Sequence, residues 1–195
     1  ADKDTSIPKI PKLLKLSPSK HIHQDSFVIF PGASASFKSW PIEAFAKVAV
    51  KIIEKYGWKP VILGGFREIS LGYQLEEKLI EYSPINLVNE TTLNELVEII
   101  RLARILVSND TSAVHIAASV NTESVCILGG GHYGRFLPYP DTIEGLKPAI
   151  IINKMSCFGC NWHCKFSNET SLPYPCISGI EVDRVFETIK NIIQD

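Results

Sequence analysis

Residues 108–115 combine side chains that bind anions with side chains that bind sugars. They place a carboxylate at Asp110, hydroxyls at Thr111 and Ser112, and an imidazole at His115. Small and cap-forming residues predict the start of a helix here, and the first amides of a helix suit a diphosphate. A carboxylate repels phosphate, so Asp110 is better suited to sugar hydroxyls. Helix capping is the alternative role of Asp110, and a hydrogen bond on a partly buried helix face is the alternative for His115.

A second anion-binding signal lies in the loop at residues 32–40. Small residues allow a ligand to approach the backbone, and serine hydroxyls such as Ser34 stand near the ammonium of Lys38. These groups could hold an anion just ahead of a helix N-terminus. A plain Gly/Ser turn with a solvated lysine is the alternative explanation.

Two further glycine-containing loops carry charged side chains. Glu68 follows Gly64 and Gly65, where a carboxylate could accept both hydrogens of a ribose diol or could simply favour a helix start. Residues 129–138 hold four glycines with His132 and Arg135, which predicts a mobile flap that meets an anion. This last loop is not a Walker A loop, because no Gly-Lys-Ser/Thr follows. The chain also lacks Gly-x-Gly-x-x-Gly after a first strand, so nicotinamide dehydrogenases are disfavoured.

Four of the five cysteines fall within twenty residues of one another near the end of the chain. The spacing could hold zinc tetrahedrally, although we favour thiols that pack a loop around Phe158 and Trp162. The cysteines are Cys157, Cys160, Cys164 and Cys176, with His163 as a spare ligand.

These loops must be positioned by strands and helices that alternate from Ser26 onward. Short apolar runs predict strands at residues 27–30, 60–63, 85–88, 105–107, 124–128 and 149–152. Helical spacing predicts helices at residues 41–56, 67–82, after Thr92, after a cap at Asn109 or Asp110, and at 179–193. Such strands are parallel and buried on both faces, so we expect an open, doubly wound α/β sheet of the Rossmann-like type. Ligands then bind beyond the carboxyl ends of the strands, which each of these loops follows.

Composition limits the remaining classes. The chain has 195 residues, 45% hydrophobic and 21% charged, with a net charge of −1. This balance provides no general electrostatic attraction to nucleic acid or anionic membrane, and no apolar run approaches the roughly 20 residues of a membrane-spanning helix. Three prolines and five lysines before residue 26 indicate a linker or an extended strap, or a poorly ordered terminus. We see no secretory leader and expect a reducing cytosol.

Taken together, the motifs resemble the family-9 glycosyltransferases, the ADP-heptose–lipopolysaccharide heptosyltransferases and their relatives. The most specific parts are Phe-Lys-Ser-Trp-Pro at 37–41 and Ser-Asn-Asp-Thr-Ser-Ala-Val-His-Ile-Ala-Ala at 108–118. The Cys-x-x-Cys segment followed by a last helix also looks like the tail of many members. The resemblance runs from Phe27 to the C-terminus.

The resemblance implies one half of a GT-B glycosyltransferase, which has two Rossmann-like domains. Residues 26–195 look like the C-terminal, nucleotide-sugar donor-binding domain, with a Cys-rich loop at 155–178 and a closing helix at 179–195. Residues 1–25 look like the interdomain strap. The catalytic base is expected in the N-terminal domain, so the resemblance implies no catalytic residue in this chain.

The resemblance also implies a role for each loop. The donor diphosphate would be held by Lys38, Ser34, Thr111 and Ser112. Glu68 would bind the ribose, and Val88 would lie near the base. The donor sugar would contact Asp110 and His115. The flap on the acceptor side would be formed by Gly130, His132 and Arg135. Glycine is common in the family where Ser112 stands, so a side chain there could crowd the approach of the phosphate to the backbone. Residues 129–132 depart from the Gly-Pro-Thr-like loop of many members, so the acceptor or the sugar could differ from heptose.

The function implied is inverting transfer of heptose from ADP-heptose to a lipopolysaccharide core or related cell-surface glycan. The partners would be the nucleotide-sugar and, through the N-terminal domain, a glycolipid acceptor, without nucleic acid and without a required cofactor. The full enzyme would be cytoplasmic, with peripheral association at the inner face of the bacterial inner membrane. Two alternatives are a non-catalytic nucleotide- or sugar-binding module on the same fold, and a zinc-stapled interaction or nucleic-acid module that the neutral charge disfavours.

Overall fold

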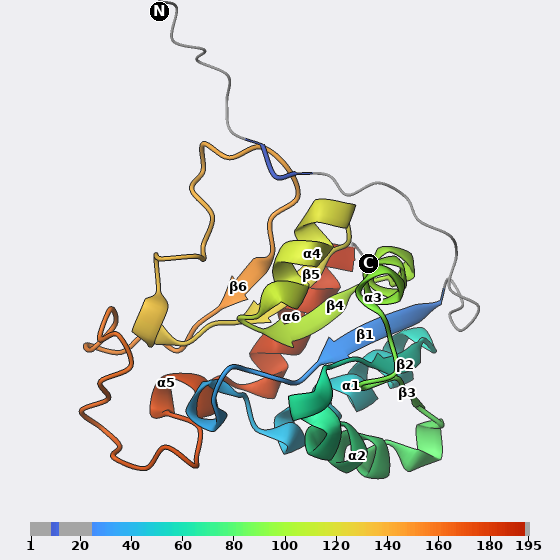
Figure 1. Ribbon diagram of the computed structural model, residues 1–195, viewed down its shortest axis with the longest axis horizontal. Coiled ribbons are helices and arrows are strands. Elements are labelled where there is room, and N and C mark those ends of the chain that lie inside the picture. Colours follow the sequence, from blue (N-terminus) through green and yellow to red (C-terminus); the bar gives the residue numbers. More distant parts are fainter. Residues whose placement is uncertain (1–8, 12–24, 194–195) are drawn as a thin grey trace, which may run out of the picture.

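The computed structural model describes residues 9–11 and 25–193, and a parallel sheet of six strands forms the centre of this part of the chain (Figure 1). All adjacent strands run parallel, in the order β3-β2-β1-β4-β5-β6. The strands are β1 (Ser26–Phe30), β2 (Lys59–Ile62), β3 (Ile85–Asn86), β4 (Leu106–Asn109), β5 (Ser124–Ile127) and β6 (Ala149–Ile151).

This strand order confirms the predicted doubly wound sheet. The chain reverses its direction across the sheet between β1 and β4, and such a switch point leaves a crevice at the carboxyl ends of the strands. Each of the six predicted strands is found. The third is shorter than expected, because Asn86 Oδ1 accepts a hydrogen bond from the Val88 amide at 3.1 Å and Asn89 then turns the chain with φ of 63°.

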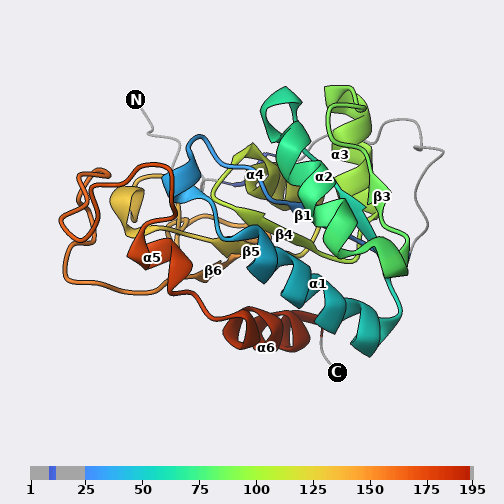
Figure 2. The same cartoon turned by 90° about the horizontal axis from the view of Figure 1, so that it is seen from below.

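Helices cover both faces of the sheet (Figure 2). On one face, α1 packs against both α2 and α6, while α3 packs against α4 on the other. The helices are α1 (Ile42–Tyr56), α2 (Ile69–Lys78), α3 (Leu93–Leu102), α4 (Ser112–Val120), the short α5 (Pro175–Ser178) and α6 (Val182–Ile193). Single 3-10 turns lie at η1 (Ser36–Lys38), η2 (Phe66–Glu68), η3 (Ile80–Tyr82) and η4 (Gly130–His132).

Alternate side chains of each strand face opposite layers. In β4, Val107 packs with α1 and α6, whereas Leu106 packs with α3 and α4. Both residues are fully buried. This two-sided burial explains the nearly continuous apolar runs from which the strands were predicted.

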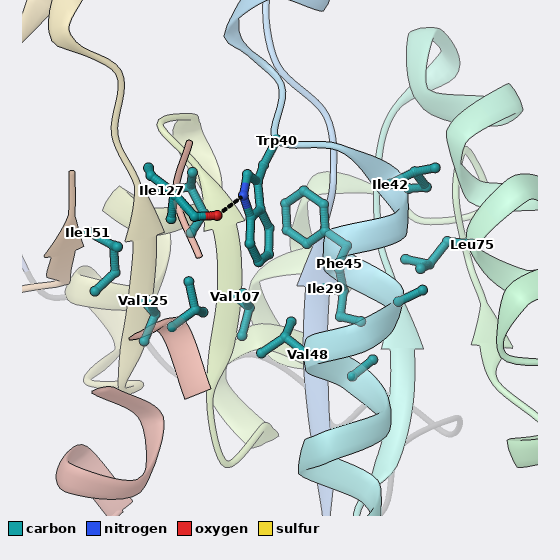
Figure 3. Close-up of a cluster of buried hydrophobic side chains, with 14 of the residues drawn as sticks. Ile29, Trp40, Ile42, Phe45, Val48, Leu75, Val107, Val125, Ile127 and Ile151 are labelled. Carbon is teal, nitrogen blue, oxygen red and sulfur yellow. Dashed lines mark hydrogen bonds between the residues drawn. The ribbon is translucent and has the colours of Figure 1, made fainter. Parts of the chain in front are cut away.

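Trp40 anchors the loop after β1 in the core (Figure 3). Its ring packs edge-on against Phe45 at 5.1 Å between centroids, and its Nε1 donates a hydrogen bond to the Ile180 carbonyl at 3.0 Å. The loop that carries Lys38 is therefore fixed at its end to the start of α1 and to the segment before α6.

The predicted strap at residues 1–25 falls largely outside the described residues. Within the described part, Ile10 donates a backbone hydrogen bond to Glu144, and Lys9 forms an ion pair with the Glu144 carboxylate at 3.2 Å. Among residues 9–11 and 25–193, none of the helices has the length and apolar character needed to cross a membrane.

Candidate functional site

A cavity of about 460 Å³ lies where the loops after β1, β4 and β5 meet. This is the edge of the sheet at which parallel α/β folds bind ligands. Phe136 and Trp162, which were not predicted to be site residues, contribute to the cavity wall. The cavity also brings together seven of the side chains predicted for the site: Ser34, Lys38, Asp110, Thr111, Ser112, His115 and His132.

Lys38 supplies a cation to this cavity. It lies in η1, and its Nζ donates a hydrogen bond to Ser34 Oγ at 3.1 Å. The same ammonium lies 4.8 Å from the centroid of the Trp162 ring. The two residues that the sequence assigned to one anion site are therefore in direct contact.

Asn109 holds the loop after β1 against the end of β4. Its Nδ2 donates to the carbonyls of Pro31 at 2.8 Å and Gly32 at 3.0 Å, and its Oδ1 accepts from the Trp40 amide at 2.9 Å. The side chain is fully buried. Sequence reasoning considered Asn109 only as a helix cap and missed this positioning role.

Asn109→Ala is expected to lower the free energy of unfolding by about 2 kcal/mol, because it removes hydrogen bonds to three buried backbone groups, of which only the Pro31 carbonyl keeps another donor among the described residues, Ser39 Oγ at 3.0 Å. Chemical denaturation of the purified variant measures this loss. Asn168→Ala, at an exposed loop position, is the matched control and should leave stability unchanged. Equal stabilities of the wild type and Asn109→Ala would contradict the positioning role.

The N-terminus of α4 faces the cavity and is capped by Thr111. Thr111 Oγ1 accepts from the Ala113 amide at 3.3 Å and lies 3.2 Å from Ser108 Oγ. The predicted cap at Asn109 or Asp110 is therefore wrong, because the side chain of Asn109 serves the β1 loop and the hydroxyl of Thr111 reaches the helix amide. Asp110 is left to line the cavity.

Asp110 is a partly buried carboxyl group surrounded by basic side chains. Burial raises its pKa above the ordinary value, and the nearby charges of His115, His132 and Lys38 oppose that shift. These groups can neutralise a carboxylate or an incoming phosphate, while Asp110 itself can accept hydrogen bonds.

A tyrosine orients the histidine on α4. His115 Nδ1 forms a hydrogen bond with the Tyr139 hydroxyl, whose pKa is raised by burial. His115 is therefore hydrogen-bonded on a half-buried helix face, which was the alternative considered for it, and it also lines the cavity. Its contact with the donor sugar stays a prediction. Tyr139 carried no motif that could have indicated this contact.

Glu68 and Val88 lie farther along the same edge of the sheet, outside this cavity. Glu68 Oε2 accepts from the Gly65 amide at 2.8 Å. A Cβ at Gly64 would lie 2.7 Å from Glu68 Cβ and 3.3 Å from Val88 Cγ1, and a Cβ at Gly32 would lie 2.4 Å from Glu68 Cγ. Glu68 is thus in contact with the loop after β1, and Val88 lies beside it toward β3, where it lines a second cavity of about 250 Å³.

Of the three residues predicted for the flap, one lines the cavity, one packs against a neighbouring segment and one is exposed. His132 lines the cavity, and its Nε2 lies 2.9 Å from Asn161 Oδ1. Gly130 is instead buried against Phe158, because a Cβ there would lie 2.4 Å from Phe158 Cδ2. Arg135 is exposed, with its guanidinium 5.2 Å from the Phe136 ring centroid. Neither Gly130 nor Arg135 lines the cavity.

The cysteines of segment 155–178 are free thiols that gather near Cys176. Burial raises the pKa of Cys176, and the proximity of Cys157, Cys160 and Cys164 acts in the same direction. Within the part of the chain that the structure describes, no three His, Cys, Asp or Glu side chains are arranged to hold a metal ion. Zinc binding by these cysteines, which the sequence analysis considered but did not favour, stays untested.

Comparison with known proteins gives consistent matches. The family model for glycosyltransferase family 9 (heptosyltransferase) matches residues 8–162. Lipooligosaccharide heptosyltransferase 2 of Haemophilus ducreyi is 38% identical over 95 residues, which cover 47% of this chain and 27% of that protein. The enzyme of the same name from Campylobacter jejuni is 26% identical over 170 residues, which cover 85% of this chain and 50% of that protein. The chain thus spans about half or less of these curated relatives.

The fold is also shared with a solved enzyme. The structure of Escherichia coli ADP-heptose lipopolysaccharide heptosyltransferase II superposes with a TM-score of 0.71 at 21% identity, over 89% of this chain and 48% of that chain. This likeness confirms the Rossmann-like α/β fold. Its coverage is that expected for one half of a GT-B glycosyltransferase.

Proposed function

Because the chain belongs to glycosyltransferase family 9, we propose that it is the donor-binding half of an inverting enzyme that transfers heptose from ADP-heptose to a lipopolysaccharide core. The names of the matched relatives support the sugar and the acceptor class. The observation that carries the proposal is the cavity at which Lys38, Ser34 and the N-terminus of α4 converge.

The donor diphosphate is assigned to this convergence. An ammonium and a hydroxyl from the loop after β1 face the helix start at Thr111 and Ser112. The first amides of α4 have no acceptors within the helix, and Thr111 Oγ1 satisfies only that of Ala113. Amides and a cation together bind a phosphate group in the manner known at helix N-termini.

The order of side chains along the sheet edge supports one direction for the bound nucleotide. Asp110 follows β4 and His115 lies in the first turn of α4, whereas Lys38 follows β1, Glu68 follows β2 and Val88 follows β3. We assign these positions to the sugar, the diphosphate, the ribose and the base, in that order. Asp110 and His115 then contact heptose hydroxyls, and Glu68 accepts hydrogen bonds from the ribose diol.

The chemical task of this half is stabilisation of the leaving group. An acceptor oxygen attacks the anomeric carbon of the donor, the bond from that carbon to the β-phosphate oxygen breaks, and the configuration inverts. The electron pair passes to the diphosphate, where Lys38 and the α4 amides compensate the developing charge. The acceptor proton passes to a base that we place in the other half of the enzyme.

The names of the relatives also support a proposal for the acceptor and its location. The acceptor is proposed to be a glycolipid bound through the other half, at the cytoplasmic face of the bacterial inner membrane. Lys38 and the α4 amides balance the phosphate charge in this proposal, and we assign no role to a metal or another cofactor.

The purified 195-residue chain is expected to bind ADP and ADP-heptose but to transfer no sugar, because binding and the catalytic base are divided between two halves. Thermal unfolding measured with ADP, GDP, UDP and TDP tests binding, since a ligand at about 100 times its Kd stabilises the folded state by about 2.7 kcal/mol. Stabilisation by ADP above the other nucleotides supports the proposal. Absence of any nucleotide effect would contradict donor binding, and turnover by this chain alone would contradict the division of roles.

A further inference from the structure

Trp162 is held at the cavity wall by an unusual backbone. Asn161 and Trp162 have successive positive φ angles of 48° and 67°. Residues other than glycine rarely adopt this left-handed conformation, and it persists where the surrounding structure enforces it. Two hydrogen bonds tie the same turn to the loop after β5, from the Gly159 amide to the Gly130 carbonyl at 2.8 Å and from the Asn161 amide to the Gly131 carbonyl at 3.0 Å.

The indole lies directly on the backbone of that loop. A Cβ at Gly131 would be 2.3 Å from Trp162 Cδ2, and a Cβ at Gly129 would be 2.6 Å from Trp162 Cη2. Both glycines are thus explained by the ring that packs on them. Trp162 Nε1 is buried and has no hydrogen-bond partner among the described residues, so the indole contributes to this wall through its ring and not through a hydrogen bond.

The ring also contacts the cation of the proposed diphosphate site. Lys38 Nζ lies 4.8 Å from the Trp162 centroid and 5.7 Å from the Phe37 centroid, and both aromatic residues are half-buried. A cation within about 6 Å of an aromatic ring is attracted to the electron-rich face. The ring therefore restricts a side chain that would otherwise sample many rotamers.

We propose that Trp162 is a positioning residue for the donor diphosphate: it holds the Lys38 ammonium at the cavity wall in the absence of ligand. This role rests on the proposed function, and it links the Cys-rich segment to donor binding. A lysine that is already in place loses less conformational freedom when the phosphate binds.

The test is a double-mutant cycle on ADP affinity, measured by titration calorimetry with the full 195-residue chain. Trp162→Leu is expected to raise the Kd for ADP on the order of 3- to 10-fold, the range of a partly desolvated cation–π contact. Trp162→Phe should retain most of the affinity, because it keeps an aromatic face. In the Lys38→Ala background, Trp162→Leu should have little further effect. Phe166→Leu, an exposed aromatic of the same segment, is the matched control.

The outcomes distinguish a failure of the proposed donor-binding function from a failure of the role of Trp162. Wild-type protein that binds no ADP would overturn the proposed function. Wild-type binding that Trp162→Leu leaves unchanged, or effects that add fully in the double mutant, would overturn the role of Trp162 alone. If Trp162→Leu does not fold, the NMR chemical shift of the Lys38 ε-methylene protons in the wild type tests the contact. An upfield ring-current shift supports the contact, and a chemical shift among those of the other lysines overturns it.

Discussion

Lys38→Ala is expected to weaken ADP binding by about 10- to 100-fold, since hydrogen bonds to charged groups contribute about 1.5–3 kcal/mol. Lys38 lines the proposed diphosphate site, and its Nζ contacts Ser34 and the Trp162 ring. In an enzyme that contains both halves, the same change should lower the rate by about 10²–10³, the usual effect of removing one donor that stabilises a developing anion. Titration calorimetry and steady-state kinetics measure the two effects.

Lys47→Ala is the matched control for this substitution. Lys47 is exposed on α1 and lines a different groove of the surface. The Lys47→Ala protein should bind ADP with the same affinity as the wild type. A Lys38→Ala protein with unchanged ADP affinity would remove Lys38 from the site.

Asp110→Ala is expected to act on the sugar and the nucleotide in opposite directions. Affinity for ADP-heptose should fall by about 10- to 100-fold through the loss of charge-assisted hydrogen bonds to the sugar. Affinity for ADP alone should rise, because a carboxylate near the diphosphate is removed. Parallel titrations with ADP and ADP-heptose measure the difference, and an equal loss for both ligands would contradict contact between Asp110 and the sugar.

The isosteric substitution Asp110→Asn is expected to stabilise the folded protein at neutral pH, because it removes a partly buried carboxylate. Burial raises the pKa of Asp110, so the folded state holds this proton more tightly than the unfolded chain does. Stability therefore falls as pH rises through the carboxyl range, and Asp110→Asn should have a higher Tm than the wild type at pH 7. The gain should vanish below the ordinary aspartate pKa of 3.8. Asp141→Asn, in an exposed loop, should show no such gain.

The sheet was predictable because its physical signals are local. Apolar runs of four to five residues appear wherever a strand is buried on both faces, and Val61 in β2 and Val107 in β4 are fully buried as expected. The start of α1 after Pro41 and its left-handed end at Gly57 were also readable from residue types. By contrast, α5 is only four residues long and has no helical period to detect.

Part of the cavity lining was predictable from residue types at the ends of strands. Lys38 and Asp110 were found by this reasoning, and the fold brings them to one cavity although they are far apart in sequence. Asn109, Tyr139 and Trp162 were missed because their roles depend on partners that only the folded chain supplies. Asn109 shows this most clearly, since its three backbone partners lie 69 to 78 positions earlier in the chain.

The role of the glycines after β5 was also not predictable from the sequence. Their number suggested a mobile flap, whereas in the structure Gly129 and Gly131 accommodate the ring of Trp162 and Gly130 that of Phe158. Composition alone does not distinguish a glycine needed for motion from one needed for close approach of another segment.

A crystal structure of this chain soaked with ADP-heptose tests the central claim most directly. The account predicts that the diphosphate lies between Lys38 Nζ and the amides of Thr111 and Ser112, with heptose against Asp110 and the ribose against Glu68. A nucleotide bound on another surface, or a diphosphate that Lys38 does not contact, would contradict it.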